Sequence, residues 1–280
     1  MQSTETIQAV QDYYGGLAER GSTDRSEDYQ TSVAKAFGYD PEDLKSLPEN
    51  ANLGVSCGNP LALASLREGE TVIDLGSGGG IDVILAARKV GPKGKAIGVD
   101  MTKKMLALAH QNVEKAGITN ASFVEGFITA IPLEASTADC IISNCVINLV
   151  PKEQKSLVFH EMFRLLKPGG RVAISDILAR RELPPDFAND FGADAGFGGT
   201  STNPLTSDQT MLMLCADIMI VDTKVDLNVY KDMPQEKEPA CCGMSCSDVH
   251  NNDKIQDLTV MNVLALSKYM PSSHVKRCES

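Results

Sequence analysis

Between residues 71 and 176, short apolar segments alternate with longer segments in which apolar residues recur every three or four positions. The short segments are typical of buried strands, and the longer ones of amphipathic helices. Because strands that alternate with helices form parallel sheets, we expect an α/β fold with helices on both faces of a mostly parallel sheet. The predicted strands are 71–75, 95–99, 121–125, 138–143 and 171–175, and the clearest helices are 101–116 and 152–166.

The pattern is weaker on either side of this segment. Residues 1–55 are polar and predict a helical cap ahead of the sheet. Residues 187–215 are rich in glycine and small polar residues and show no clear period. Two more strands are predicted within 217–229 and 258–269, separated by a polar insert that contains cysteines. The chain thus divides into an N-terminal helical cap, a core and a smaller C-terminal α+β region, with boundaries at 1–55, 56–185 and 186–280.

Composition and charge narrow the class of protein. At 280 residues the chain is long enough to bury a large core, and its 42% hydrophobic and 22% charged residues are ordinary for a globular protein. A net charge of −11 argues against nucleic acid or an anionic membrane as a partner. No apolar run approaches the roughly 20 residues of a transmembrane helix, and residues 1–6 lack the parts of a signal peptide. We therefore expect a cytoplasmic enzyme.

A glycine-rich loop follows the first predicted strand. Residues 72–80 read Val-Ile-Asp-Leu-Gly-Ser-Gly-Gly-Gly, which places Gly76, Gly78 and Gly80 at alternate positions after Asp74. A dinucleotide-binding loop requires a glycine three positions after Gly78, where this chain has isoleucine. Without β-carbons, such a loop turns tightly and lies close against a ligand. The form Asp-x-Gly-x-Gly-x-Gly resembles the first motif of class I S-adenosylmethionine-dependent methyltransferases; the alternative is a glycine-rich turn of another α/β protein.

A second acidic residue supports a cofactor site. Asp100 ends the second predicted strand, 20 residues after Gly80 (100 − 80). In nucleotide-binding sheets an acid at this place accepts hydrogen bonds from ribose hydroxyls. The next residue, Met101, either contacts the ribose or adenine or belongs to the core. A solvated aspartate at a strand end is common, but together with the glycine loop Asp100 favours a bound S-adenosylmethionine.

Eight cysteines are present, at positions 57, 140, 145, 215, 241, 242, 246 and 278. In a reducing cytosol we expect free thiols rather than a disulfide framework. Cys57 lies in a glycine-flanked turn ahead of the first strand. Cys145 lies at the carboxyl end of the fourth strand, where ligands bind in open α/β sheets. Each of them, taken alone, is also consistent with a packed structural thiol, which is what we expect for Cys140.

Four motifs occur in an order that resembles the arsenite methyltransferase family. They are Asn-Leu-Gly-x-x-Cys-Gly-Asn-Pro at 52–60, Asp-Leu-Gly-Ser-Gly-Gly-Gly at 74–80, Gly-Val-Asp-Met-Thr at 98–102 and Ile-Ser-Asn-Cys-Val-Ile-Asn-Leu at 142–149. The resemblance covers roughly residues 35–185, and it is specific because the two cysteine motifs are unusual among methyltransferases in general. It implies a Rossmann-like class I methyltransferase core that transfers a methyl group from S-adenosylmethionine to trivalent arsenic, as in arsenic detoxification.

The resemblance also implies roles for individual residues. Cys57 and Cys145 are the catalytic pair, which binds trivalent arsenic as thiolates. Among the cofactor-binding residues, Gly126 and Phe127 border the adenine and Asn144 reaches the methionine end. The full set is Asp74, Gly76, Gly78, Gly80, Asp100, Met101, Gly126, Phe127 and Asn144. The partners are a trivalent arsenical substrate and a reductant, either a small thiol or a thioredoxin-type protein.

The chemistry of trivalent arsenic suits these residue types. Arsenic is soft, prefers thiolates and keeps a lone pair opposite its three ligands. The lone pair attacks the sulfonium methyl directly, so the transfer needs no general base. The protein holds the two reactants in place, a positioning effect of up to roughly 7–11 kcal/mol. Because the thiols lose protons on binding, we expect arsenic affinity to rise with pH.

Two departures from the family pattern concern further thiols. Family members commonly carry a cysteine upstream of the Cys57 motif, and this chain has none before position 57. Many also carry a Tyr-x-Gly-Cys segment after the Leu-Pro that here is 183–184, whereas residues 187–215 take its place through divergence, deletion or an out-of-frame exon. The candidate replacements are Cys215, Cys241, Cys242 and Cys246. The alternative for the last three is a disordered, redox-exposed loop. A site of two thiolates is expected to prefer substrates that already carry a methyl group.

Two other functions stay open on the sequence alone. A class I methyltransferase of another small molecule, such as a quinone precursor, would need a base and leaves both cysteine motifs unexplained. A non-catalytic, thiol-rich protein would instead sequester arsenic or another metal, with residues 187–215 too altered for turnover. Product analysis distinguishes such a binding protein from an enzyme, because a binding protein releases no methylated product.

Overall fold

The computed structural model describes residues 3–21, 27–179, 217–223 and 258–266. The first helices are α1 (Ser3–Arg20), α2 (Glu27–Ala36), α3 (Pro41–Lys45) and α4 (Pro60–Ala64). The core then alternates β1 (Thr71–Leu75), α5 (Ile81–Val90), β2 (Lys95–Asp100), α6 (Lys103–Lys115) and β3 (Ala121–Glu125). It continues with β4 (Ala138–Asn144), the short 3₁₀-helices η2 (Ile147–Leu149) and η3 (Lys152–Gln154), α7 (Lys155–Leu165) and β5 (Leu166–Ala179). The last described elements are β6 (Asp217–Thr223) and β7 (Leu258–Leu266).

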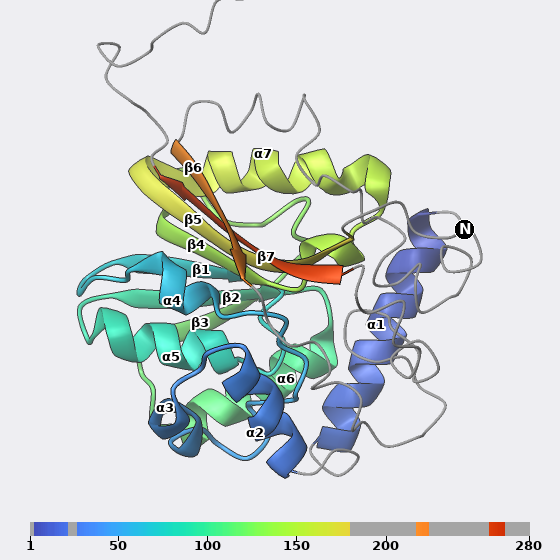
Figure 1. The fold of residues 1–280 in the computed structure, drawn as a ribbon, viewed down its shortest axis with the longest axis vertical. Coiled ribbons are helices and arrows are strands. Elements are labelled where there is room, and N and C mark those ends of the chain that lie inside the picture. The colour runs from blue at the N-terminus through green and yellow to red at the C-terminus, as the bar shows by residue number, and fades with distance from the viewer. Residues whose placement is uncertain (1–2, 22–26, 180–216, 224–257, 267–280) are drawn as a thin grey trace, which may run out of the picture.

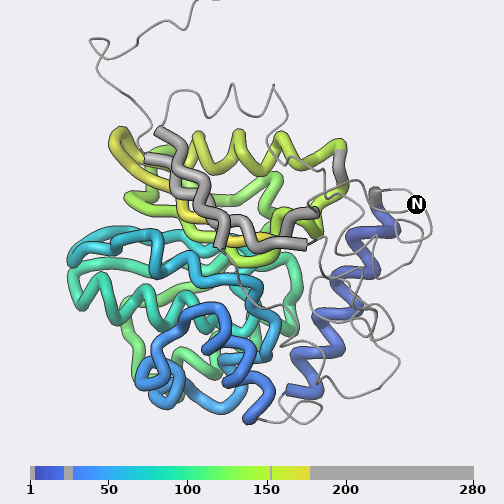
Figure 2. The backbone as a smooth tube through the Cα atoms, in the orientation of Figure 1, coloured from blue at the N-terminus to red at the C-terminus, as the bar shows by residue number. Residues whose placement is uncertain are grey.

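The strands form one seven-stranded sheet with the order β3-β2-β1-β4-β5-β7-β6. Strands β1 to β5 pair in parallel, and β7 is antiparallel to both β5 and β6. Figure 1 shows α7 on one face of the sheet and α5 with α6 on the other, and Figure 2 shows the same path as a continuous tube. The predicted Rossmann-like arrangement, a mostly parallel sheet with helices on both faces, is therefore confirmed.

All five predicted core strands are present. β1 and β3 have the predicted bounds, whereas β5 begins at Leu166 instead of residue 171. Leu166 pairs with Ala138 before an irregularity in the register, and residues 167–170 continue the strand from there. The two strands predicted beyond residue 215 are β6 and β7, which extend the same sheet. The segment 187–215 and the cysteine-bearing insert lie outside the described residues, and the three-part division of the chain stays a proposal.

The sheet separates two hydrophobic cores because successive side chains of a strand point to opposite faces. Val72 of β1 packs in one core with Val83 of α5. The next residue, Ile73, packs in the other core with Phe159 and Met162 of α7. All five side chains are almost fully buried, and each contributes about 1.5–3 kcal/mol relative to an exposed side chain. The continuous apolar runs of the central strands thus follow from burial on both faces.

Helix α1 packs beside the sheet against α6. Leu17 of α1 forms a buried cluster with Met105 and Leu108 of α6. The side chain of Gln11 donates a hydrogen bond from Nε2 to the carbonyl oxygen of Met101 at 3.0 Å. These contacts place α1 next to the carboxyl end of β2, where the sequence predicts the cofactor.

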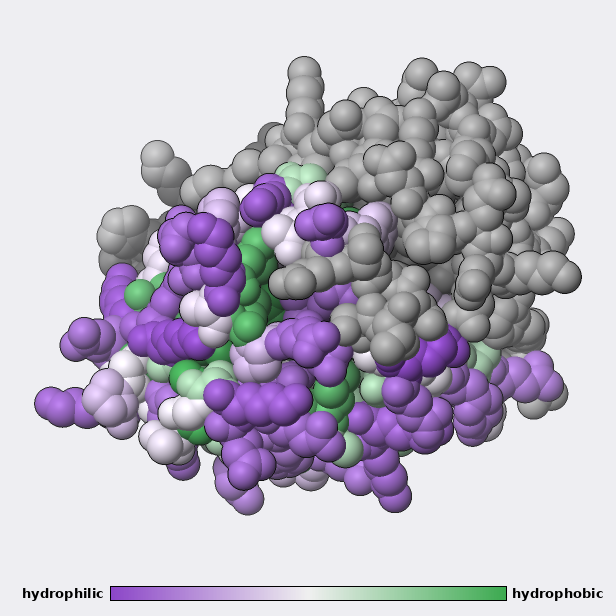
Figure 3. All heavy atoms as spheres, turned by 90° about the horizontal axis from the view of Figure 1, so that it is seen from below, coloured by the Kyte–Doolittle hydropathy of each residue, from purple (hydrophilic) through white to green (hydrophobic). Residues whose placement is uncertain are grey.

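One face of the described part of the protein is mostly polar. Figure 3 shows one face on which hydrophilic residues dominate and hydrophobic residues are visible only in small areas between them. Within the described ranges, no helix is both long and apolar enough to cross a membrane.

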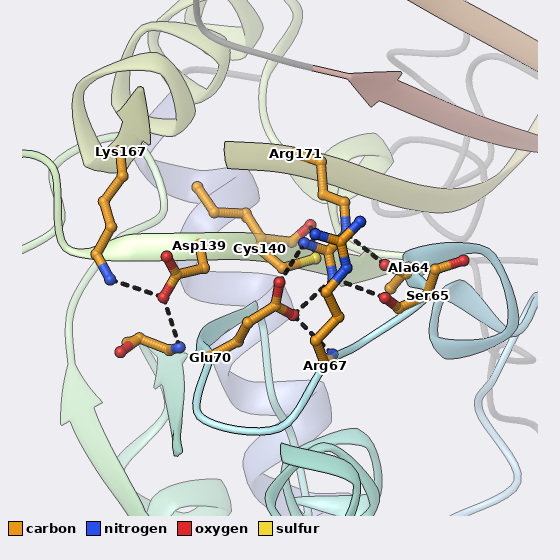
Figure 4. Close-up of polar contacts among 10 residues, drawn as sticks. Ala64, Ser65, Arg67, Glu70, Asp139, Cys140, Lys167 and Arg171 are labelled. Atoms are coloured by element: carbon orange, nitrogen blue, oxygen red, sulfur yellow. Dashed lines mark hydrogen bonds and ion pairs between the residues drawn. The ribbon is translucent and has the colours of Figure 1, made fainter. Parts of the chain in front are cut away.

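A cluster of ion pairs joins the amino-terminal ends of β1, β4 and β5 (Figure 4). The guanidinium of Arg171 donates to both carboxylate oxygens of Glu70 at 2.7 Å and to the carbonyl oxygens of Ala64 and Ser65. Burial raises the pKa of Glu70, but the hydrogen bonds from Arg171 outweigh it and hold the pKa below its usual value. Arg171 therefore ties β5 to the end of α4 and to the start of β1.

We expect Arg171→Ala to lower the free energy of unfolding by about 3 kcal/mol, because it leaves Glu70 and two carbonyl groups without their buried partner. Since the pKa of Glu70 is depressed, this contribution is present above the unfolded-state pKa and is lost as the pH falls through the folded-state value. Urea denaturation at neutral pH measures the change. Lys45→Ala is the control, because the Lys45–Glu42 pair is largely exposed and its loss is expected to change stability little. Equal effects of the two substitutions would contradict this interpretation.

Candidate active site

A largely apolar pocket lies at the carboxyl ends of β1, β2 and β4. Predicted site residues contribute much of its lining: Gly76, Gly78, Asp100, Met101, Gly126, Phe127, Asn144 and Cys145. Helix α1 closes one side through Ile7, Val10 and Tyr14. Asp74, Gly80 and Cys57 lie next to these residues in the chain or in space without lining the pocket itself. The fold thus brings most of the predicted cofactor residues to one place.

The glycine loop turns sharply between β1 and α5. Gly76 and Gly78 have φ values of +69° and +50°, which residues with a β-carbon rarely adopt. The backbone amides of Gly76 and Ser77 both donate to the carbonyl oxygen of Val99 on β2, at 2.7 and 3.0 Å. A β-carbon at Gly78 would meet open space, so this position faces room for a ligand.

The carboxylate of Asp100 holds this loop. Its Oδ2 accepts a hydrogen bond from the amide of Gly78 at 3.0 Å, and its Oδ1 accepts one from the amide of Thr102 at 2.8 Å. Burial raises the pKa of Asp100, and these hydrogen bonds lower it in part. Asp100 therefore shapes the loop from the edge of the pocket, while its predicted bond to a ribose stays a prediction.

Two further carboxylates are buried close to the loop. Asp74 is 4% exposed near the end of β1, and Asp82 is 3% exposed in the first turn of α5. Burial raises the pKa of Asp74 well above its usual value, and the charges of Asp82 and Asp100 raise it further. Burial also raises the pKa of Asp82, to about 6. Two buried acids and the half-buried Asp100 around one loop favour a positively charged ligand, because such a ligand offsets the cost of ionising them.

Cys57 and Cys145 meet beside the pocket. They are 88 residues apart in the chain, yet their Cα atoms lie 5.6 Å apart and their sulfur atoms are bonded to each other. Both are buried. The sequence predicted free thiols at all cysteines, and this prediction is wrong for Cys57 and Cys145. Folding brings the two residues to a Cα separation that a disulfide spans. The convergence itself agrees with the prediction that these cysteines act together.

The backbone aims the side chain of Cys145 into this contact. Cys145 has φ +59°, a left-handed conformation that costs a residue with a β-carbon about 1–3 kcal/mol. Its amide donates to the carbonyl oxygen of Ser175 on β5 at 2.9 Å. The next residue, Val146, packs against Gly76 so closely that a β-carbon at Gly76 would collide with both of its methyl groups. The glycine loop and the cysteine segment are therefore in direct contact.

Two residues of the site, Tyr39 and Asp82, are not predicted by the sequence motifs. Tyr39 donates a hydrogen bond from its hydroxyl to Oδ1 of Asp82 at 2.8 Å, and both residues contact the side chain of Asn144. Asn144 was expected at the methionine end of the cofactor; it lines the pocket, and its amide also binds the backbone around Cys57. One signal was present in the sequence: Asp82 is an acid within the otherwise apolar first turns of α5.

The remaining cysteines do not complete a three-thiol site in the described part of the chain. Cys140 is fully buried in β4, and burial raises the pKa of its thiol to about 12. The predicted replacement thiols Cys215, Cys241, Cys242 and Cys246 lie outside the described residues. Across residues 3–21, 27–179 and the two last strands, no group of three or more His, Cys, Asp or Glu side chains is placed to hold a metal ion.

A family model described as a methyltransferase domain matches residues 66–237. The chain belongs to the methyltransferase domain family. Its fold is that of class I methyltransferases, which use S-adenosylmethionine as the methyl donor.

Several relatives of this methyltransferase share one name. It is 42% identical over 200 residues to a protein of Halobacterium salinarum named arsenite methyltransferase, an alignment that covers 66% of this chain and 51% of that protein. A human protein of the same name is 32% identical over 197 residues, covering 67% of this chain and 52% of that protein. The methyltransferase thus spans about half the length of the curated relatives it matches.

A solved structure agrees with these relatives. The X-ray structure of CrArsM, described as an arsenic (III) S-adenosylmethionine methyltransferase from Chlamydomonas reinhardtii, aligns with a TM-score of 0.55 at 26% sequence identity. The alignment covers 86% of this chain and 74% of the other. A second group of relatives, named ubiquinone/menaquinone biosynthesis C-methyltransferase, is 34% identical over 112 residues, which is 40% of this chain.

We expect Gly76→Ala to destabilise the protein more than Gly117→Ala. Both glycines have nearly the same positive φ, +69° and +66°, so both substitutions incur the backbone cost of about 1–2 kcal/mol. Only at position 76 does the new methyl group collide with Val146, which adds about 1–3 kcal/mol and displaces the segment that carries Cys145. Chemical denaturation and S-adenosylmethionine binding of the two variants measure the difference. Equal stability and equal binding would disprove the proposed contact between loop and cysteine segment.

Proposed function

We propose that this protein transfers a methyl group from S-adenosylmethionine to trivalent arsenic held by Cys57 and Cys145. The observation that carries the proposal is the convergence of these two cysteines beside the pocket, with Cα atoms 5.6 Å apart. The names of the Halobacterium salinarum and human relatives support arsenite as the substrate class. The proposed role in the organism is arsenic detoxification.

The residues of the pocket fit S-adenosylmethionine. This cofactor supplies an electrophilic methyl group on a positively charged sulfur. The loop at Gly78 has open space beside it, and the carboxylates of Asp74 and Asp100 provide negative charge next to that space. Met101 and Phe127 offer apolar surface for the adenine. These residues, with Gly76, Gly80, Gly126 and Asn144, form our proposed cofactor site.

The two sulfurs act as soft ligands for arsenic. Each thiol must lose its proton to bind arsenic, so binding releases protons and strengthens as the pH rises. When the two sulfurs are bonded to each other, they have no free thiolate to offer, and a two-electron reduction must come first. We therefore propose a small thiol or a thioredoxin-type protein as the reductant, and the cytoplasm as the compartment that maintains the reduced state.

The protein's contribution to the transfer is positioning. The lone pair of trivalent arsenic is itself the nucleophile, so no side chain has to remove a proton at the transfer step. The left-handed backbone at Cys145 and the contact between Val146 and Gly76 hold the thiol pair against the cofactor loop. Such positioning supplies up to roughly 7–11 kcal/mol.

We expect Cys57→Ser to lower the rate of arsenic methylation by about a hundredfold or more, since even a misplacement of ~1 Å has an effect of that size. Cys140→Ala is the matched control, because Cys140 is buried in β4 with its sulfur against its own strand, and its loss is expected to leave the rate unchanged. Methylated products are measured by arsenic speciation in the presence of a thiol reductant. Full activity of Cys57→Ser would refute the assignment, and transfer to a quinone precursor by both variants would favour the function of the second group of relatives.

A site with only two thiolates is expected to act faster on methylarsenite than on arsenite. Methylarsenite has one carbon ligand already and needs just two sulfurs to complete its three bonds, whereas arsenite exchanges three oxygen ligands. Initial rates with the two substrates, at equal concentration and with the same reductant, test this preference. Equal rates would indicate a third protein thiol, for which Cys215, Cys241, Cys242 and Cys246 are our candidates; their serine variants would then identify it.

A further inference from the structure

A closed group of three polar side chains, two of them buried and the third half-buried, lies beside the cysteine pair. Tyr39 follows α2, Asp82 lies in the first turn of α5, and Asn144 ends β4. The Tyr39 hydroxyl donates to Oδ1 of Asp82 at 2.8 Å, and Nδ2 of Asn144 donates to the Tyr39 hydroxyl at 2.9 Å and to Oδ2 of Asp82 at 3.2 Å. Each of the three side chains therefore contacts the other two. Tyr39 and Asp82 are each only 3% exposed, so the hydrogen bond between them is shielded from water.

The amide of Asn144 also binds the backbone on both sides of the Cys57 side chain. Its Oδ1 accepts a hydrogen bond from the amide of Cys57 at 3.2 Å. Its Nδ2 also lies 3.1 Å from the carbonyl oxygen of Gly58, so its two N–H groups are shared among three acceptors. Cys145 is the residue that directly follows Asn144. One side-chain amide thus connects the segment that carries the first cysteine to the segment that carries the second.

The orientation of this amide is decided by its partners. The two ends of an asparagine amide have the same shape, but the oxygen only accepts hydrogen bonds and the nitrogen only donates them. A carboxylate such as Asp82 accepts only, so it requires the Nδ2 end, and Oδ1 is left facing the amide of Cys57. The opposite orientation would place oxygen against oxygen at Asp82 and donor against donor at Cys57.

We propose that Tyr39 and Asp82 are positioning residues that orient the amide of Asn144 and thereby set the separation of the Cys57 and Cys145 sulfurs. The assignment of arsenic to this pair rests on the proposed function above, whereas the hydrogen bonds stand without it. A second hydrogen bond links the same two segments, those of Tyr39 and Cys57: Asn59 donates from Nδ2 to the carbonyl oxygen of Gly38, next to Tyr39, at 2.9 Å. Burial raises the pKa of Asp82 and the hydrogen bonds from Tyr39 and Asn144 lower it in part; the net value of about 6 leaves the acceptor ionised at neutral pH.

The test measures the proximity of the two thiols directly and needs no methyl transfer. Full-length protein is equilibrated with mixtures of reduced and oxidised glutathione. Two protein thiols reduce one glutathione disulfide to two glutathione molecules and form the Cys57–Cys145 bond. After alkylation of free thiols, peptide mapping by mass spectrometry quantifies this bond separately from the other six cysteines. The equilibrium constant reports how well the fold holds the two sulfurs together.

We expect Tyr39→Phe and Asp82→Asn each to lower this equilibrium constant by about tenfold, the size of an effect expected from one lost hydrogen bond to a charged group. Asp139→Asn is the matched control. Its carboxylate also accepts two hydrogen bonds, from the amide of Thr71 and from Lys167 (Figure 4). These bonds lie at the amino-terminal ends of the strands, away from the cysteine pair, so the equilibrium constant is expected to stay within about twofold. An equal decrease in Asp139→Asn would show a general loss of stability and overturn the proposal.

A double-mutant cycle separates positioning from a local packing role. If Tyr39 and Asp82 act through the amide, neither substitution changes the constant further in an Asn144→Ala background. Undiminished effects in that background would overturn the proposal. Thermal unfolding identifies any variant that fails to fold, and Tyr39→Phe, which removes one hydroxyl group, keeps the test decisive if Asp82→Asn does not fold. Because the readout is thiol exchange, a protein that shifts as expected but methylates no arsenical would refute the proposed function and leave this inference intact.

Discussion

The parallel pairing of β1 with β2 and with β4 determines where the proposed site of this protein lies. Parallel strands end at the same edge of a sheet, so the glycine loop after β1, Asp100 at the end of β2 and Cys145 after β4 meet there. The contact between Gly76 and Val146 joins the first and last of these elements, because only a residue without a β-carbon leaves room for the valine. The glycine loop and the segment that carries Cys145 therefore depend on each other's position.

Carboxylates at the two ends of the strands differ in the direction in which their pKa values shift. At the amino-terminal edge, Arg171 pairs with Glu70, and the net effect on the pKa of Glu70 is a decrease (Figure 4). At the carboxyl edge, burial raises the pKa values of Asp74, Asp82 and Asp100. The first arrangement stabilises the fold by itself. The second is costly without a cationic ligand, which is the expected property of a site for a sulfonium cofactor.

Helix α4 connects these two edges. It begins one residue after Asn59, its N-cap, which accepts a hydrogen bond from the amide of Ala62 and lies two residues beyond Cys57. At its other end, the carbonyl oxygens of Ala64 and Ser65 accept hydrogen bonds from Arg171. The short helix thus holds the Cys57 segment between the ion-pair cluster and the amide of Asn144.

Local patterns determined much of this protein in advance. Strand positions, the glycine loop, the acid at residue 100 and the two cysteine motifs were predictable, because periodicity and turn residues reflect the preferences of neighbouring backbone positions. The early start of β5 was not, since it depends on register with Ala138. Nor was the group formed by Tyr39, Asp82 and Asn144, whose members are separated by 43, 62 and 105 residues. Only the packed sheet decides such contacts, because hydrogen bonds between distant residues form only once the register of the sheet has brought them together.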